Sequence, residues 1–355
     1  MLRGMSGSTQ MRVVIAGAGA LGSSFALALA RRGARVTLAD PSPRGSASAV
    51  AAGMLAPVFE SVLDDDTAIP FEILRASAAL WTDLAVQIGL DLDRLGSMAV
   101  GAAEDLDRWE VRAVSLGAPC ERLGRGRAEA RLLGLRAPEG ALFTPHDIRL
   151  DPRLALSALI RAAKVAVRPA GLVGFEAGRA VFDDGDVVEA DAVVVATGAS
   201  TSLARLAPEL TALGPIKGHI LRLSGGPVDG PVVRMASGYV CPTPQGAVVG
   251  ASMEPGRGDL CVDAAIVERL ARQAFAALPD LEGMPIHPEV GVRAATADGW
   301  PLAGRSSTPG VWIAGGARRN GWLLAPMIAE ALAAAMAADR EPQLPTGFDP
   351  RRFGV

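Results

Sequence analysis

The chain has 355 residues, of which 50% are hydrophobic and 21% are charged. This composition indicates a folded globular protein, and the length predicts two domains. The net charge of −3 argues against a nucleic-acid partner, because domains that bind nucleic acid are usually strongly basic. The cysteines have no CxxC spacing and the histidines are far apart, so no metal site and no disulfide framework is predicted.

Several other classes of protein are excluded by missing patterns. No run of 18 apolar residues occurs, so no transmembrane helix is expected. Residues 1–10 lack the apolar core of a signal peptide, which makes the cytoplasm the expected location. The hydrolase patterns HExxH, GxSxG and SxxK are absent as well.

The first strong pattern is a strand, a glycine-rich turn and a helix. Residues 12–16 are predicted as a buried strand, and Gly17, Gly19 and Gly22 form a GxGxxG turn before a helix at 23–32. A second strand at 36–39 ends at Asp40, where a ribose-binding acid belongs. The glycines let the backbone approach a pyrophosphate, and the start of the helix supplies free N–H groups. The unit predicts a dinucleotide site, and the acid favours NAD or FAD over NADP; the alternative is a glycine-rich turn without a ligand.

Three later segments favour FAD over NAD. Residues 45–57 are rich in small side chains and are not helix-patterned in their first half, so they suit contact with an extended ligand. Residues 190–199 form an apolar strand that ends in Thr-Gly and follows a hairpin with its turn near Asp184. Residues 310–321 are predicted as a strand and a glycine turn before a helix at 322–338. A second helix N-terminus suits the carbonyl edge of a reduced flavin.

The order of these motifs resembles the FAD-dependent D-amino-acid oxidase superfamily and, within it, the glycine oxidases of the thiamine pathway. The motifs are AAGML at 51–55, IKG at 216–218, YVCP at 239–242, VVGASMEPG at 248–256, GVR at 291–293, DG at 298–299 and RNGWLLAP at 319–326. No cysteine lies near Arg319, where a flavin-linked cysteine would be expected in sarcosine oxidases. The resemblance therefore implies noncovalent FAD.

The resemblance also implies an α/β fold, α+β overall, with a Rossmann-like FAD-binding domain and a substrate domain on a large mixed or antiparallel sheet. The FAD-binding domain is expected at 11–85, 147–212 and 288–345, and the substrate domain at 86–146 and 213–287. Alternation within 232–255 agrees with a hairpin in that sheet, with its turn at 244–246. Residues 1–10 and 346–355 are expected to be flexible ends, and the family suggests a homo-oligomer.

An arginine suits a substrate carboxylate because its planar guanidinium donates two charge-assisted hydrogen bonds. Arg293 matches the family's carboxylate-binding arginine, Tyr239 its substrate tyrosine and Arg319 a second arginine of the site. These three are the predicted catalytic residues, and with Met54 they are the predicted substrate-binding residues. The predicted cofactor-binding residues are Gly17, Gly19, Ala20, Leu21, Gly22, Asp40, Pro41, Ala47, Ser48, Ala52, Gly53, Met54, Leu172, Thr197, Gly198, Gly316, Ala317, Arg318, Arg319, Asn320, Gly321, Trp322 and Leu323.

Three positions depart from the family pattern and leave glycine specificity open. Ser237 replaces a histidine, Ala317-Arg318 replaces a His-Phe pair, and Ala294 stands where proline often follows the arginine.

The implied reaction is oxidative deamination of glycine or another small D- or N-substituted amino acid. Hydride would pass from the substrate Cα to flavin N5, giving an imine and, with oxygen as acceptor, hydrogen peroxide. An FAD-dependent dehydrogenase that passes electrons to a quinone remains the alternative. An NAD-linked dehydrogenase would need a histidine or lysine at the hydride site, and none is recognisable. A non-catalytic flavoprotein is the other reading left open.

Overall fold

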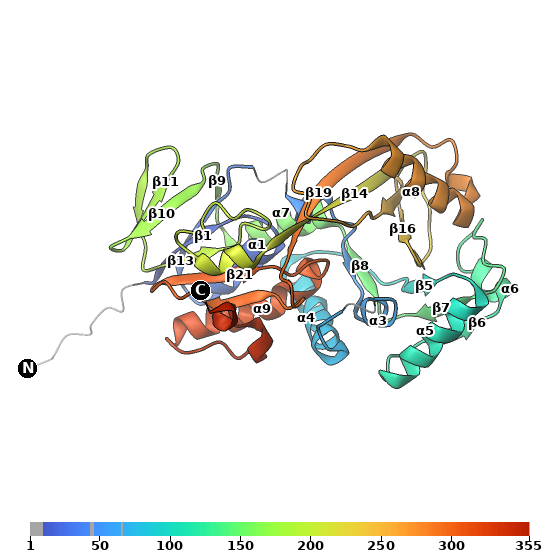
Figure 1. Ribbon diagram of the computed structural model, residues 1–355, viewed down its shortest axis with the longest axis horizontal. Helices are drawn as coiled ribbons and strands as arrows, with labels where there is room; N and C mark the ends of the chain where they lie inside the picture. The colour runs from blue at the N-terminus through green and yellow to red at the C-terminus, as the bar shows by residue number, and fades with distance from the viewer. Residues whose placement is uncertain (1–9, 43–45, 65–66, 355) are drawn as a thin grey trace, which may run out of the picture.

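The protein is represented by a computed structural model that describes residues 10–42, 46–64 and 67–354. Two lobes lie side by side, one around a six-stranded sheet and one around a nine-stranded sheet (Figure 1). Nearly all of the expected flexible end at 1–10 is outside the described residues.

The first lobe is built on a mostly parallel sheet with the order β20-β21-β13-β1-β2-β9. From β21 to β9 all neighbours are parallel, and β20 is antiparallel to β21. Its central strands are continuously apolar because both faces are covered, one by helices and the other by residues within 170–190 and 203–213. The Rossmann-like fold is thereby confirmed. The strands are β1 (Arg12–Ala16), β2 (Arg35–Ala39), β9 (Val167–Arg168), β13 (Ala192–Val195), β20 (Leu302–Arg305) and β21 (Val311–Gly315).

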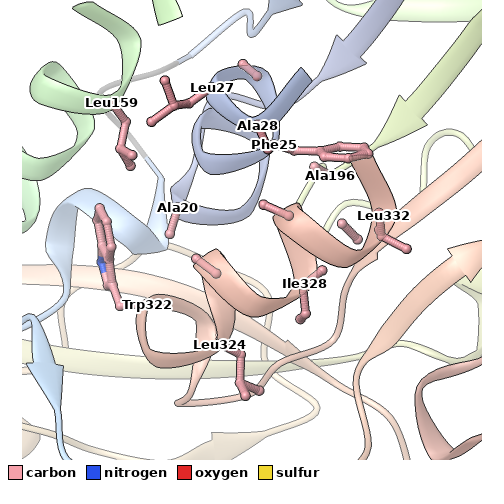
Figure 2. Packing of buried hydrophobic residues seen from close by; sticks show 14 of the residues in the cluster. Ala20, Phe25, Leu27, Ala28, Leu159, Ala196, Trp322, Leu324, Ile328 and Leu332 are labelled. Carbon is pink, nitrogen blue, oxygen red and sulfur yellow. The ribbon is translucent and has the colours of Figure 1, made fainter. Parts of the chain in front are cut away.

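Helices α1 (Ala20–Arg31) and α9 (Gly321–Ala337) pack against each other on this sheet, with α7 (Pro152–Ala163) and α4 (Phe71–Ile88) beside them. Figure 2 shows Leu27 of α1 pointing toward Leu159 of α7, and Phe25 of α1 beside α9. Small side chains such as Ala28 let the helix backbones approach closely. This packing fixes the N-termini of α1 and α9 relative to the sheet.

The second lobe is built on a mixed sheet with the order β18-β14-β17-β16-β15-β5-β7-β6, and β19 also pairs with β14. Only the β5–β15 pair is parallel among the pairs described. The strands are β5 (Ser97–Ala99), β6 (Glu121–Leu123), β7 (Ala141–Thr144), β14 (Gly214–Ser224), β15 (Val232–Met235), β16 (Gly238–Thr243), β17 (Gly246–Gly250), β18 (Glu254–Pro255) and β19 (Ile286–Ala295). Helices α5 (Ala103–Ser115), α6 (Arg125–Glu129) and α8 (Ala264–Ala277) flank this sheet.

The expected hairpin in the second lobe is β16 and β17, joined by the turn at residues 244–245. Strand β19 pairs with β14 over its whole length, so it crosses the predicted domain boundary at residue 288. The domain division itself stays a prediction.

Short elements lie around the two main sheets. Strands β3 (Met54–Leu55), β4 (Leu92–Asp93) and β8 (Ile148–Leu150) form one small sheet, and β10 (Leu172–Glu176), β11 (Arg179–Phe182) and β12 (Val187–Glu189) another. Hairpin β11–β12 encloses the turn expected near Asp184. Other short elements are α2 (Ala47–Val50), α3 (Pro57–Val62) and the 3₁₀ helices η2 (Pro208–Ala212) and η3 (Pro279–Leu281). None of the helices in the described ranges is long and apolar enough to cross a membrane.

Two local expectations differ from the structure. The segment at 45–57 was not expected to begin as a helix, but α2 makes one turn there, capped by the Ser46 side chain. The end at 346–355, expected to be flexible, is packed in 3₁₀ helices η4 (Thr346–Phe348) and η5 (Pro350–Phe353). Phe348 is fully buried against Trp300, and Arg352 forms an ion pair with Asp298 at 2.8 Å. These contacts hold the tail against the first lobe.

Candidate active site

A cavity of about 370 Å³ lies where α2, β3 and α9 of the first lobe meet β14, β16 and β19 of the second. Nine of the predicted site residues line it although they come from distant parts of the chain: Ala47, Ala52, Gly53, Met54, Tyr239, Arg293, Arg319, Asn320 and Trp322. The fold therefore brings the predicted substrate residues and part of the predicted cofactor segment to one place.

Arg293 on β19 is a partly buried cation in the cavity wall. A Cβ on Gly218 of the neighbouring strand would lie 2.2 Å from the Arg293 Nη1, so glycine there makes room for the guanidinium. Nη1 donates a hydrogen bond to the carbonyl oxygen of Ser252 at 3.3 Å. Burial lowers the pKa of Arg293, and no carboxylate of the described residues forms an ion pair with it. Such a group suits an anionic ligand.

Tyr239 on β16 places its ring in the same cavity. A Cβ on Gly250 would lie 2.5 Å from the tyrosine hydroxyl, so the phenol packs directly on the β17 backbone. Burial raises the pKa of Tyr239 above its ordinary value of 10, which keeps the phenol neutral. The hydroxyl has no hydrogen-bond partner within the part of the chain that the structure describes.

Arg319 differs from Arg293 because carboxylates already balance its charge. Its Nη2 lies 2.8 Å from Glu60 Oε2 and 2.5 Å from Asp64 Oδ2. Arg318 pairs with Asp64 at 2.9 Å, and Arg234 of β15 pairs with Glu60 at 3.1 Å.

Glu60 is the centre of this buried network. Burial by itself would raise the pKa of Glu60, but the charges of Arg319 and Arg234 outweigh burial and hold the pKa at about 2. Helix α3, which carries Glu60, is fixed at its start because both oxygens of Asp147 accept backbone N–H bonds from residues 58 and 59, at 2.8 and 3.0 Å. The network therefore holds the Arg319 side chain in one orientation at the cavity edge.

The predicted dinucleotide turn has the close backbone contacts that require glycine. Gly17 has a φ of +104°, and a Cβ there would lie 2.3 Å from the carbonyl oxygen of Ala196. A Cβ on Gly22 would lie 1.9 Å from the Gly17 carbonyl oxygen. Asp40 follows β2, and its carboxylate accepts hydrogen bonds from the N–H groups of Ala18 and Ser42, each at 2.8 Å.

Two helix N-termini have unpaired N–H groups that fit an anionic dinucleotide. At α1 the N–H of Ala20 donates to Ser48 Oγ at 3.0 Å, while those of Leu21 and Gly22 have no acceptor in the described ranges. Asn320 precedes α9 and gives no side-chain cap, so the first N–H groups of α9 are likewise free among the described residues. These donors, with the glycine turn, fit a pyrophosphate and a flavin carbonyl edge.

The other predicted cofactor residues lie at strand ends of the first lobe. Thr197 and Gly198 follow β13, and Gly316 and Ala317 follow β21. Leu172 is buried with residues of β1 and β2, whereas Pro41 is exposed. Their contacts with a cofactor stay a prediction.

Sequence reasoning missed four charged residues of the site: Glu60, Asp64, Arg234 and Arg269. A usable signal exists for two of them. Glu60 lies within Pro57–Val62 and Arg234 within Val232–Met235, both otherwise largely apolar segments. A lone charge in such a run is usually buried and paired.

Comparison with known proteins agrees with this geometry. The chain is 29% identical to the glycine oxidase of Geobacillus kaustophilus, covering 97% of this chain and 96% of that protein. The crystal structure of glycine oxidase from Geobacillus kaustophilus superposes with a TM-score of 0.83 at 27% identity, covering 97% and 99% of the two chains. The crystal structure of iminodiacetate oxidase from a Chelativorans species superposes with a TM-score of 0.84 at 26% identity, covering 96% and 98%.

The name of a further relative indicates a different function. The tRNA 5-methylaminomethyl-2-thiouridine biosynthesis bifunctional protein of a Caulobacter species is 29% identical over 96% of this chain, which spans only 57% of that protein.

The family model DAO, described as FAD dependent oxidoreductase, matches residues 12–335. Because that match covers most of the chain, from the glycine turn to the end of α9, the protein belongs to this family of FAD-dependent oxidoreductases.

Proposed function

We propose that this FAD-dependent amino-acid oxidoreductase oxidises glycine or another small D- or N-substituted amino acid at the carbon next to the carboxylate. The oxidation removes hydride from that carbon and a proton from the nitrogen, and water then splits the resulting imine. The observation that carries the proposal is Arg293, a partly buried guanidinium without an ion-pair partner among the described residues, in the same cavity as the neutral phenol of Tyr239.

In this proposal Arg293 anchors the substrate carboxylate through two parallel hydrogen bonds, and the Tyr239 hydroxyl donates a third. Arg319 lines the same cavity, and its ion pair with Glu60 holds its side chain beside the proposed carboxylate position. Fixing the carboxylate at several points aligns the reacting carbon, and such positioning supplies a large part of an enzyme's rate. The bound flavin supplies the hydride acceptor.

The cofactor is held by the first lobe. The N–H groups at the start of α1 would donate hydrogen bonds to the pyrophosphate. The Asp40 carboxylate, which now accepts backbone N–H bonds, would accept hydrogen bonds from the hydroxyl groups of the adenosine ribose. The start of α9 and the segment 47–54 would surround the flavin beside Arg319 and Trp322. No cysteine lines the cavity among the described residues, so the proposal assigns the flavin no cysteine link there.

The electron acceptor distinguishes two versions of the proposal. Oxygen as acceptor gives hydrogen peroxide and makes the protein an oxidase, as the names of its glycine oxidase and iminodiacetate oxidase relatives suggest. A quinone or other carrier would make it a dehydrogenase. The similarity to the tRNA biosynthesis protein suggests a second candidate substrate, an amine carried on a nucleic acid. The net charge of −3 disfavours that candidate.

Anaerobic mixing of the FAD-loaded protein with glycine, sarcosine, D-alanine and proline tests the proposal. We expect at least one of these amino acids to bleach the flavin absorbance, and oxygen to restore the colour with release of peroxide. If bleaching occurs but oxygen returns the colour slowly and an artificial acceptor returns it fast, the protein is a dehydrogenase. If no amino acid bleaches the flavin, the proposed activity is wrong.

The variant Arg293→Ala tests the anchor. Loss of a buried charge partner costs roughly 2–5 kcal/mol, so kcat/KM should fall by about 30-fold to several thousandfold. Arg75→Ala is a suitable control because that arginine is exposed on α4 and contacts only Glu72. Unchanged kcat/KM in Arg293→Ala, with FAD still bound, would remove Arg293 from the substrate site.

A further inference from the structure

The lining of the cavity contains more positive charge than one substrate carboxylate balances. Four arginines line it, at positions 234, 269, 293 and 319, and Glu60 is the only carboxylate in the lining among the residues that the structure describes. Glu60 is shared by Arg234 and Arg319, and Asp64 also supports Arg319. Arg293 and Arg269 are left without a carboxylate among the described residues. If Arg293 holds the carboxylate next to the reacting carbon, a second cation remains.

Arg269 is on α8, a helix that packs on β14, β16 and β17 and lies above the second sheet in Figure 1. Its side chain is exposed and forms no hydrogen bond or ion pair within the described ranges. The neighbouring arginine on the same helix, Arg272, pairs with Glu268 and does not line the cavity. Arg269 therefore adds an unpaired charge at the solvent side of the cavity.

A second donor lies on the hairpin turn between β15 and β16. Ser237 in that turn lines the cavity, and its Oγ accepts a hydrogen bond from Gln273 Nε2 of α8 at 2.9 Å. With that accepting position used, the hydroxyl hydrogen remains available to donate. The rest of the turn is small, with Ala236 and Gly238 also lining the cavity, so no bulky side chain fills the space beside Ser237.

We propose that Arg269 and Ser237 form a subsite for a second carboxylate, so that the preferred substrate is a dicarboxylic amino acid. The inference rests on the proposed function and specifies its substrate class. The Arg269 guanidinium is positively charged and can only donate, and the Ser237 hydroxyl can donate beside it, so the subsite favours an anion over a cation or an apolar group. The reacting carbon remains positioned by the carboxylate on Arg293.

Matched substrates that differ by one carboxylate test this subsite. Iminodiacetate is sarcosine with a carboxylate added to its methyl group, and D-aspartate is D-alanine with the same addition. We expect kcat/KM to be higher for the dicarboxylate in at least one pair by about fivefold or more, the effect of one partly exposed ion pair. Arg269→Gln should remove most of that ratio, and Arg272→Gln should leave the ratio as it is.

Binding without turnover gives an independent readout. Succinate and propionate have no amine and cannot be oxidised in this reaction, and succinate is propionate with one more carboxylate. Succinate should therefore raise the melting temperature of the FAD-loaded wild-type protein more than propionate does. Arg269→Gln should reduce the difference and Arg272→Gln should not. If monocarboxylic amino acids are turned over but dicarboxylates are not preferred, or if Arg269→Gln keeps the preference, the subsite is wrong while the proposed function stands. If neither kind bleaches the flavin, the proposed function fails first.

Discussion

Replacing Glu60 by glutamine removes the negative charge that joins Arg319 to Arg234. Glu60 is 6% exposed, so little solvent is present to screen the loss. The lowering of its pKa from 4.5 to about 2 corresponds to roughly 3 kcal/mol in favour of the folded protein at neutral pH. Loss of one partner of a buried ion pair typically costs about 3–5 kcal/mol, which is the same size. We therefore expect Glu60→Gln to lower the free energy of unfolding by about 3 kcal/mol.

The sign of the pH dependence follows from the lowered pKa. A carboxylate whose pKa is lower in the folded protein stabilises it above the unfolded pKa, near 4.5, and loses that effect as the pH falls through about 2. The difference in stability between wild type and Glu60→Gln should thus be constant between pH 5 and 7. At pH 3 roughly half of it should remain.

Thermal unfolding of the FAD-loaded proteins measures the difference. A loss of about 3 kcal/mol lowers the melting temperature by roughly 4 °C in a chain of this size. Glu72→Gln is the control, because Glu72 forms an exposed ion pair with Arg75 at 3.4 Å and should change the melting temperature by about 1 °C at most. A drop in Glu60→Gln no larger than that in Glu72→Gln, or one that does not shrink in acid, would refute the reasoning.

Two further predictions concern the cofactor turn and the tyrosine. Gly22→Ala should abolish FAD binding in equilibrium dialysis, since the new Cβ would lie 1.9 Å from a backbone oxygen. The control Gly126→Ala should bind FAD normally, because there is open space around that position. Equal FAD affinity in the two variants would contradict the close packing described at Gly22. Tyr239→Phe should lower kcat/KM roughly tenfold through loss of one hydrogen bond to a carboxylate. Since burial keeps the phenol neutral, the wild-type pH–rate profile should show no tyrosine ionisation up to pH 10; a break near 9 that disappears in Tyr239→Phe would show that the phenol ionises during turnover.

Local patterns were sufficient to predict several elements of the first lobe, whereas its overall fold was implied by the resemblance to a family. The strand at 12–16, the glycine turn and the helix that follows are set by contacts between residues close in sequence, and the structure places them within a few residues of expectation. The same holds for the strand before Thr197 and for the glycine turn before α9. Each of these elements carries its own signal because apolar runs, turn glycines and helix starts act over short distances.

The packed C-terminal tail and the helical turn of α2 could not be predicted in that way. Phe348 is buried in the core of the first lobe and packs against Trp300, which is 48 residues earlier in the chain. The pairing of β19 with β14 across the predicted boundary likewise depends on contacts between residues far apart in sequence. In each case the tertiary contacts outweigh the local sequence preferences.

The sequence alone determined that the protein has a dinucleotide turn, a small set of candidate arginines and a single tyrosine, because residue types and spacing are local properties. Only the tertiary structure decided which of the arginines have their charge balanced by a nearby carboxylate. Glu60 and Asp64 lie on or after α3, more than 250 residues before Arg319, and their meeting leaves Arg293 and Arg269 as the cavity's unpaired cations among the described residues. Charge compensation depends on distances of a few ångströms between side chains, and no spacing along the chain encodes those distances.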